Sequence, residues 1–335
     1  MKEILLIGNG PSATDYTMGE AIDAFPYVVR FNAFRIHGFK EYVGKKCDVW
    51  FAVDNFPQWQ HQYDYKEVYY VNPVRDKPNP KFDRFKADMP DAKLLPAWVW
   101  DDVTAKMKAH PSTGALAAYY FSKSYDRVYL YGFDCFGGDR HHYGDELSHC
   151  HHKAEKERAF IDGLLDEGIV RWFNNYTILH DHVTNYGCGG IFAAKILSFE
   201  PDSVLDYGCG KGERVRFLLN KGVRAVGYDP NVFEYRKRPA NQDMLVSTDL
   251  LEHIPEDKLS EVFADMRSYQ PRIMFHVISN RKADQILPDG TNAHKTIKDA
   301  NWWLGKLRKE FADYDVELLG HNEKNCFSTY LLERN

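Results

Sequence analysis

The sequence predicts an α/β protein that contains two doubly wound parallel sheets in tandem. Residues 4–12 and 203–212 each begin with a short apolar run, continue with glycines and lead into a helix-compatible stretch. This strand–loop–helix order is typical of the opening of a nucleotide-binding α/β unit. Because the two openings lie far apart in a chain of 335 residues, we expect two tandem Rossmann-like domains. The pattern changes between residues 176 and 184, so the expected domains are 1–178 and 179–335.

Composition excludes several classes of protein. Apolar residues make 44% of the chain and charged residues 27%, which are globular values. The formal charge of −5 provides no basic surface for nucleic acid. No apolar run reaches the ~18–20 residues that cross a bilayer, and the N-terminal residues have no signal-peptide layout. The six cysteines are scattered and form no C-x-x-C pair. We therefore expect reduced thiols, a cytoplasmic location, no membrane span and no nucleic-acid partner.

Strands and helices alternate along both expected domains. The first domain continues with predicted strands at residues 27–31, 48–53, 67–71 and 126–133, and with helices at 115–123 and 153–168. Ser112, Thr113 and Gly114 open the first of these helices. In the second domain a helix over residues 185–199 leads into the glycine loop. Strands follow at 224–228, 244–248, 272–277 and 326–331, with helices near 258–268 and 297–311.

The second glycine loop has an acid on each side. It reads Asp206-x-Gly208-x-Gly210-x-Gly212, and Asp229 ends the next predicted strand. Glycines let the backbone approach a ligand without a Cβ clash, and the helix beyond them presents oriented N–H groups. A dinucleotide fingerprint has its third small residue one position later and no acid at position 206. Asp206 suits a ligand with an ammonium group, and Asp229 can accept both hydroxyls of a ribose.

This arrangement, together with residues 250–255, closely resembles the class I S-adenosylmethionine-dependent methyltransferases over residues 176–335. The resemblance implies S-adenosylmethionine as cofactor, with Asp206, Gly208 and Gly210 at its methionine end and Asp229 at its ribose. Only residues 231–243 separate the second strand from the next apolar run. The family's usual third strand is therefore expected to be shortened or lost, and the adenine pocket is unassigned.

Methyl transfer is an in-line displacement that depends mostly on positioning, and it needs a base only when the acceptor must lose a proton. His253, His276 and His294 are candidates for that base. The alternative for each is a structural or surface histidine. Trp302 and Trp303 are candidates for the wall of an acceptor pocket, with helix-core packing as their alternative role.

The first glycine loop, Gly8-x-Gly10-x-x-Ala13, also fits a dinucleotide fingerprint. That fingerprint requires an acid at the end of the second strand, where this chain has Asn32, so an oxidoreductase is disfavoured. Four motifs instead resemble, in order, those of the mammalian-type sialyltransferases over residues 1–173. Residues 7–46 resemble the L sialylmotif, residues 110–114 with 126–133 the S motif, and residues 141–143 motif III. His152 and Glu157 match the very short motif.

The resemblance implies a variant of the GT-A glycosyltransferase fold and an inverting transfer from a CMP-activated sugar. The departing phosphate gains negative charge, which fixed donors stabilise. By the resemblance His142 donates to the phosphate, His152 is the general base and Glu157 orients it or caps a neighbouring segment. A histidine pKa near ~6.5 suits the base. The residues implied to bind the cytidine, ribose and phosphate are Asn9, Asn32, Ser112, Thr113 and Gly114.

A histidine-rich segment offers a second interpretation, a structural zinc site. Adjacent histidines rarely all reach one ion, and no second ligand pair is evident. The family needs no metal for catalysis, so we expect no metal requirement. The residues of this segment are His141, His142, His149, Cys150, His151 and His152.

The chain departs from the sialyltransferase pattern at three positions. Ile4 and Tyr125 stand where the family has the half-cystines that join its L and S motifs, as a reducing compartment allows. Asp134 stands where a glycine is usual. An acid near a donor phosphate repels it, so the donor can differ from that of the family.

The sequence thus predicts a bifunctional enzyme. One domain transfers sialic acid, a related nonulosonate or Kdo from a CMP-sugar to a glycan acceptor of lipopolysaccharide or capsule type. The other methylates that glycan or a related acceptor, with oxygen as the expected atom, and the oligomeric state is left open. The first alternative is a methyltransferase with a non-catalytic CMP- or glycan-binding N-terminal module. The second is a scaffold with two inactive sites, which the intact Asp206, Gly208, Gly210 and Asp229 set argues against.

Overall fold

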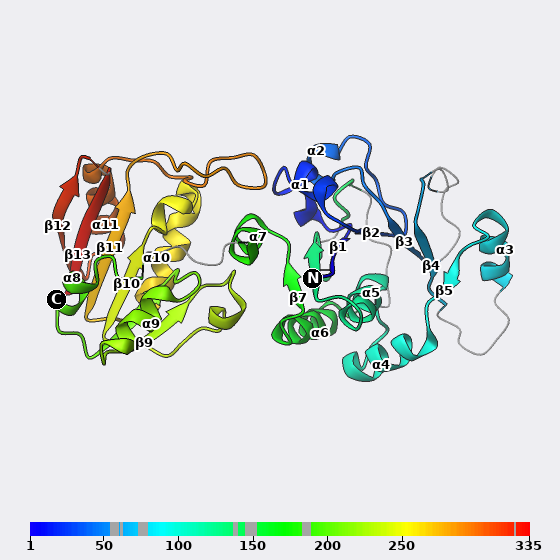
Figure 1. Ribbon diagram of the computed structural model, residues 1–335, viewed down its shortest axis with the longest axis horizontal. Coiled ribbons are helices and arrows are strands. Elements are labelled where there is room, and N and C mark those ends of the chain that lie inside the picture. Colours follow the sequence, from blue (N-terminus) through cyan, green and yellow to red (C-terminus); the bar gives the residue numbers. More distant parts are fainter. Residues whose placement is uncertain are drawn as a thin grey trace. The chain divides into compact units, whose positions relative to one another are not determined.

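The chain forms two compact units, Met1–Asn175 and Tyr176–Asn335, each with its own sheet (Figure 1). The computed structural model describes residues 1–53, 60, 63–72, 80–136, 140–144, 153–182, 189–324 and 326–335. The boundary expected after residue 178 lies within helix α7 (Asn175–His182). None of the helices in these ranges has the length and apolar character that a bilayer crossing requires.

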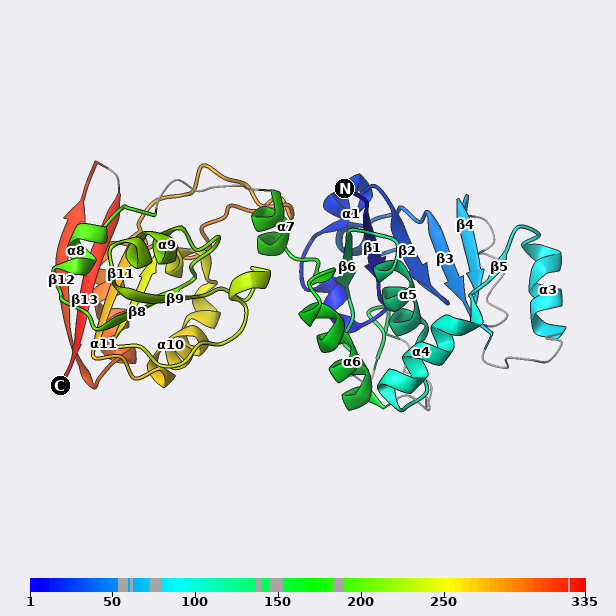
Figure 2. The same ribbon diagram turned by 60° about the horizontal axis from the view of Figure 1, so that its bottom comes forward.

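The first unit is built on a parallel sheet with the strand order β5-β4-β3-β2-β1-β6-β7 (Figure 2). The order reverses between β1 and β6. In open α/β sheets, ligands bind at the carboxyl ends of the strands that flank such a switch point. The strands are β1 (Glu3–Ile7), β2 (Val28–Phe31), β3 (Val49–Ala52), β4 (Glu67–Tyr70), β5 (Lys93–Leu94), β6 (Arg127–Tyr131) and β7 (Val170–Trp172).

Helices cover both faces of this sheet, so its central strands are apolar on both sides. Phe51 faces a core that includes residues of α4, α5 and α6, whereas Trp50 and Tyr70 face the opposite side with Phe85 of α3. The helices are α1 (Gly19–Ala24), α2 (Lys40–Val43), α3 (Pro80–Asp88), α4 (Ala97–Met107), α5 (Thr113–Ser122) and α6 (Ala154–Asp166).

The loop after β1 lies directly against the end of β6. Gly8 N donates to Tyr131 O at 2.7 Å, and a Cβ on Gly8 would lie 2.2 Å from the carbonyl oxygen of Gly132. Only glycine permits this approach of two backbones. The close contact brings the residues after both strands together at the switch point.

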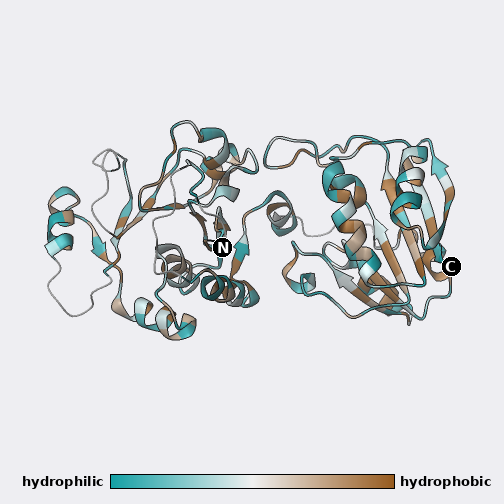
Figure 3. Ribbon diagram, turned by 180° about the vertical axis from the view of Figure 1, so that it is seen from behind, coloured by the Kyte–Doolittle hydropathy of each residue, from teal (hydrophilic) through white to brown (hydrophobic). Residues whose placement is uncertain are grey.

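The second unit contains a sheet with the order β12-β13-β11-β10-β8-β9, in which β13 runs antiparallel to both of its neighbours and the other pairs are parallel. Helices α8 (Ala193–Leu197) and α9 (Glu213–Asn220) pack on one face, and α10 (Leu259–Ser268) and α11 (Ala300–Glu310) on the other. The apolar strands lie between these helices (Figure 3). The strands are β8 (Ser203–Tyr207), β9 (Arg224–Tyr228), β10 (Met244–Thr248), β11 (Ile273–Ser279), β12 (Tyr314–Asn322) and β13 (Phe327–Arg334).

The predicted α/β class with two sheets is confirmed, and so is the loss of a strand in the second unit. Between β9 and β10, where every residue is described, the chain forms only a 3₁₀ turn, Phe233–Tyr235. The helix expected over residues 185–199 is wrong in its extent. Residues 185–188 lie outside the described part, residues 189–192 form turns, and α8 begins at Ala193. A Cβ on Gly189 would lie 2.9 Å from the backbone of Glu213, so this segment is held against the start of α9.

Candidate active sites

Ser112 connects two helices of the first unit. It is the N-cap of α5, where its Oγ accepts a 3.0 Å hydrogen bond from Ala115 N, as serine commonly does at this position. The same hydroxyl donates to Oε1 of Glu157, in the first turn of α6, at 2.7 Å. The two predicted site residues are therefore in direct contact.

Glu157 is a buried carboxyl with one oxygen unused. It is 3% exposed, and its Oε2 has no hydrogen-bond partner among the residues that the structure describes. Burial raises the pKa of Glu157 to about 7, although the bonds from Ser112 oppose this shift. The group can therefore gain or lose a proton near neutral pH.

Two asparagines follow β1 and β2 at the same sheet edge. Asn32 Nδ2 donates to Thr113 Oγ1 at 3.4 Å, and Asn9 Nδ2 donates to Phe31 O at 3.2 Å. Asn32 has φ 49°, a left-handed conformation that asparagine tolerates. Its Oδ1 is buried and, within the described ranges, has no hydrogen-bond partner. This edge thus holds a second unused buried acceptor.

His142 lies against Asn9. Its backbone N donates to Asn9 O at 2.9 Å, its Nδ1 is 3.3 Å from the same oxygen, and its Nε2 is 3.2 Å from Arg35 O. Burial lowers the pKa of His142, and the neighbouring carbonyl oxygens oppose the shift. A neutral imidazole has one N–H, so it donates to one carbonyl at a time, whereas the protonated ring donates to both.

Asp134 and Phe133, in the loop after β6, each pack against a glycine. The Asp134 Oδ2 accepts from Ser12 N at 3.2 Å and lies 1.8 Å from where a Cβ of Gly10 would be. The carboxylate therefore lies on the first glycine loop. A Cβ on Gly114 would lie 2.8 Å from the Phe133 ring, so this glycine allows the start of α5 to pack on that ring.

The structure thus brings Asn9 to His142, Asn32 to Thr113 and Ser112 to Glu157. The predicted base His152 lies outside the described residues, as do His149, Cys150 and His151 of the histidine-rich segment.

In the second unit Asp229 holds the glycine loop. Gly208, Gly210 and Gly212 all have positive φ, at 77°, 50° and 70°. Gly210 N donates to Asp229 Oδ2 at 3.0 Å, and Asn231 N donates to its Oδ1 at 2.9 Å. Asp229 is thereby fixed at the end of β9 beside the loop, which is where a carboxylate that binds the ribose hydroxyls is expected.

The Asp206 carboxylate is paired with the guanidinium of Arg214. It is 1% exposed, and its Oδ1 accepts from Arg214 Nη1 at 3.2 Å. Burial raises the pKa of Asp206, and Arg214 opposes that shift. Arg214 is thus a partner for the carboxylate that the sequence assigns to a ligand ammonium group.

The sequence analysis missed His180 and Tyr235. His180, from α7, has its Nε2 3.8 Å from Asp229 Oδ2, and burial lowers its pKa while Asp229 opposes the shift. The Tyr235 hydroxyl lies 2.0 Å from where a Cβ of Gly212 would be, so this ring covers the loop. Neither residue belongs to a motif, and only the fold reveals their position.

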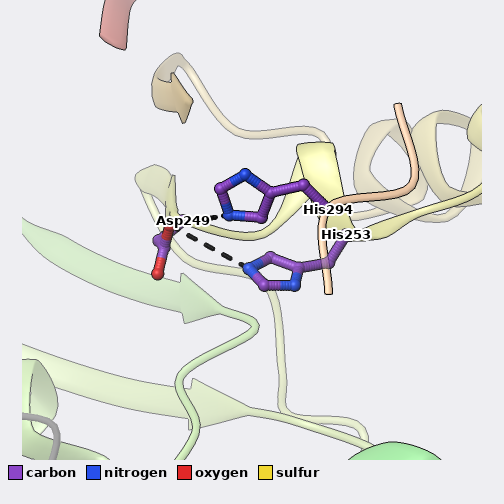
Figure 4. Close-up of side chains that lie close together, drawn as sticks. All are labelled: Asp249, His253 and His294. Atoms are coloured by element: carbon purple, nitrogen blue, oxygen red, sulfur yellow. Dashed lines mark ion pairs between the residues drawn. The ribbon is translucent and has the colours of Figure 1, made fainter. Parts of the chain in front are cut away.

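The candidate bases of the second unit separate into two environments. His276 is fully buried in β11, its Nδ1 is 2.8 Å from Ser247 Oγ, and burial lowers its pKa to about 3. Such a residue is part of the core. His253 and His294 instead lie together, with ring centroids 4.7 Å apart, and both face Asp249 (Figure 4).

Each unit matches a family model over part of its length. Residues 2–74 match glycosyltransferase family 29 (sialyltransferase), and residues 190–314 match a methyltransferase domain. Both resemblances seen in the sequence are confirmed. The chain is an enzyme of the transferase class, with a sialyltransferase-like unit followed by a methyltransferase unit. No curated protein matches the chain as a relative.

Solved structures resemble each half of the chain. A mammalian sialyltransferase in complex with Gal-beta-1-3GalNAc-ortho-nitrophenol has 19% identity, covers 51% of this chain and 69% of its own, and has a TM-score of 0.41. DhpI in complex with SAH has 15% identity, coverages of 48% and 93%, and a TM-score of 0.37. The 1,6-didemethyltoxoflavin-N1-methyltransferase of Burkholderia thailandensis, with S-adenosylhomocysteine bound, has 13% identity, coverages of 57% and 92%, and a TM-score of 0.36.

Proposed function

We propose that the chain is a bifunctional transferase in the cytoplasm. Its first unit transfers an acidic sugar, sialic acid or a related nonulosonate or Kdo, from its CMP derivative to a glycan acceptor with inversion. Its second unit methylates a hydroxyl of that glycan, or of a related acceptor of lipopolysaccharide or capsule type, with S-adenosylmethionine.

The observation that carries the glycosyl transfer is the convergence of the predicted donor residues at the switch point of the first sheet. The side chain of Asn9 donates to the backbone oxygen of the residue before Asn32, and the side chain of Asn32 donates to Thr113 Oγ1. The unused acceptors of Asn32 and Glu157 suit a ligand rich in N–H and O–H groups, such as a cytidine. Thr113 and Gly114, at the start of α5, would bind the phosphate.

Proton transfer in this site needs a donor to the phosphate and an acceptor for the proton of the attacking hydroxyl. His142 would hydrogen-bond the departing phosphate once an Nδ1–H or Nε2–H turns from its carbonyl partner. His152 would accept the hydroxyl proton. Glu157 would position the start of α5 through Ser112, since their hydrogen bond is the contact that the structure provides.

The methyltransferase site fits S-adenosylmethionine, which supplies the sulfonium methyl group when bound. The fit rests on the carboxylate of Asp229, which is fixed by two backbone N–H groups beside a loop of glycines with positive φ. Asp229 would accept the ribose hydroxyls, and Gly208 and Gly210 would face the methionine end. Asp206 would attract the ammonium group at the methionine end, and it would also hold the glycine loop through its hydrogen bond with Arg214.

The glycosyl half is tested by hydrolysis of CMP-sialic acid and CMP-Kdo by the purified full chain. We expect release of CMP by the wild type and a loss of at least a hundred-fold in the His152→Ala variant, because a positioned base contributes ~10²–10⁴ in rate. The His37→Ala variant, which removes an exposed histidine, is the matched control. A wild type that binds CMP but releases none from any CMP-sugar would favour the non-catalytic module instead.

The methyl half is tested by transfer from radiolabelled S-adenosylmethionine to the product of the first unit. Label in the glycan that resists mild base excludes a methyl ester of a carboxylate, and label recovered as an O-methyl sugar after acid hydrolysis identifies a methyl ether. Label found only in protein or in small metabolites unrelated to glycans would disprove the proposed link between the two activities.

A further inference from the structure

The second unit contains a cluster that the proposed methyl transfer does not use. Asp249 follows β10, His253 ends the 3₁₀ turn Leu251–His253, and His294 lies between β11 and α11. We infer that Asp249, His253 and His294, with Glu252 beside them, form a binding site for a first-row divalent transition-metal ion. The sequence analysis expected no metal requirement, because the sialyltransferase family needs none. It did not consider this cluster, since Asp249 and His294 are distant in the sequence and form no recognisable ligand spacing.

The distances within the cluster suit an ion better than hydrogen bonds. Asp249 Oδ1 is 3.9 Å from His253 Nε2 and 3.8 Å from His294 Nε2, which exceeds hydrogen-bond length. One ligand atom from each residue lies within 4.8 Å of the others. Bonds from zinc to imidazole nitrogen and carboxylate oxygen are ~2.0–2.2 Å, so an ion between two such atoms separates them by up to about 4 Å.

A further hydrogen bond orients the imidazole of His294. His294 Nδ1 is 2.6 Å from Arg281 O, so Nδ1 carries the proton and the lone pair of Nε2 faces Asp249 (Figure 4). Outer hydrogen bonds of this type are usual for metal-binding histidines. The Tyr176 hydroxyl is 3.1 Å from His253 O and 3.3 Å from Ala293 O, and it thereby links the two segments that carry the histidines.

Glu252 is the second, independent observation. It is fully buried, its Oε1 accepts from Ser279 N at 2.6 Å, and its Oε2 has no hydrogen-bond partner within the described part of the chain. The Asp249 carboxylate lies close to this buried carboxyl. Two neighbouring carboxyls of which one is buried are unfavourable without a cation, and a divalent ion would offset that cost.

The ligand types select the ion. Two imidazole nitrogens with one or two carboxylate oxygens suit zinc, cobalt, manganese or ferrous iron, whereas magnesium and calcium prefer oxygen ligands alone. A nitrogen that binds a metal is not free to accept a proton. His253 and His294 would then be ligands and not the base for methyl transfer.

The test is a titration of the purified, metal-free full chain with Co²⁺. Binding is measured by visible ligand-field absorption and by the change in melting temperature. The histidine-rich segment of residues 141–152 is a possible second binder, so the quantity compared is the difference between variants. We expect the His294→Ala and Asp249→Asn variants each to bind one equivalent fewer than the wild type. The His37→Ala control should bind as the wild type does.

Asp249 has a side chain that is 77% exposed, so its substitution leaves the fold intact and keeps the test valid if His294→Ala unfolds. Stabilisation by Co²⁺ should also be smaller in both variants than in the wild type, because an ion that binds the folded state raises the melting temperature. Identical titrations for the wild type and Asp249→Asn would overturn the proposal. Displacement of Co²⁺ by a comparable concentration of Mg²⁺ would overturn the assigned class of ion. Both readouts measure binding and are independent of whether methyl transfer occurs.

Discussion

The Ser112 hydroxyl donates a 2.7 Å hydrogen bond to Glu157 Oε1 while it accepts one from Ala115 N. One hydroxyl therefore caps α5 and satisfies one oxygen of a buried carboxyl from α6. The start of α5 is also where Thr113 meets Asn32. The protonation state of Glu157 and the geometry of the candidate donor site are thus connected through a single side chain.

Glu157 makes the stability of the first unit depend on pH. Its folded-state pKa is raised from 4.5 to about 7, so the folded state binds a proton that the unfolded state releases between these values. The free energy of unfolding should therefore fall as pH rises from about 4.5 to 7, by roughly 3 kcal/mol in total. Replacement by neutral glutamine removes this loss. We expect Glu157→Gln to have a higher melting temperature than the wild type at pH 8 and a similar one at pH 4.5.

Calorimetry of the full chain at both pH values measures this difference. The control is Glu155→Gln, an exposed residue in the same turn of α6, which should shift neither value. An equal effect of Glu157→Gln at pH 4.5 and pH 8 would show that the carboxyl is not buried as described.

The cap of α5 should contribute measurably to stability. Ser112→Ala removes an N-cap worth about 1 kcal/mol and leaves a buried carboxyl oxygen unpaired at a further cost of about 1–3 kcal/mol. Ser122→Ala, in the same helix, removes a hydroxyl that donates to Tyr119 O at 2.7 Å and should cost less than about 1 kcal/mol. Urea unfolding at pH 7 compares the two, and equal losses would contradict the double role of Ser112.

The contact between Gly8 and Gly132 should not tolerate a side chain. Gly8→Ala places a methyl group against the carbonyl oxygen of Gly132, just after β6, and should destabilise the unit by about 1–3 kcal/mol or more. Gly163→Ala is the control, and it should change the free energy of unfolding in the opposite direction. Gly163 is an exposed position within α6 with nothing near its missing Cβ, so alanine should stabilise by about 0.5–1 kcal/mol. Denaturation midpoints that shift in the same direction would contradict the described packing.

Asp134 should weaken the binding of a nucleotide monophosphate. Its carboxylate lies on the first glycine loop, where it accepts from Ser12 N. Asp134→Gly removes this charge and should raise the affinity for CMP roughly five-fold, since two like charges about 4 Å apart in water oppose each other by about 1 kcal/mol. Asp126→Asn, just before the start of β6, should change nothing. Calorimetric titration provides the comparison, and weaker binding by Asp134→Gly would indicate that the carboxylate contacts the donor favourably.

Much of the architecture was predictable because local pattern and tertiary role agree. The apolar runs at residues 27–31 and 244–248 became β2 and β10 within one residue at each end. Strand β7 was missed because it has three residues, too few for a pattern, and β12 because it alternates only in part at the sheet edge. His180 beside Asp229 and Asp249 beside His294 could not be predicted, since each pair joins segments that only the fold brings together.

Calorimetric titration of the full chain with CMP and with S-adenosylhomocysteine tests the existence of two separate sites most directly. Each ligand should bind once, with a dissociation constant that the other leaves unchanged. Thr113→Val should weaken CMP alone by about five-fold, through the loss of a neutral hydrogen bond. Asp229→Asn should weaken S-adenosylhomocysteine alone by ten-fold or more, because a charged acceptor is lost. A wild type that binds neither ligand, or a variant that weakens both, would contradict the account.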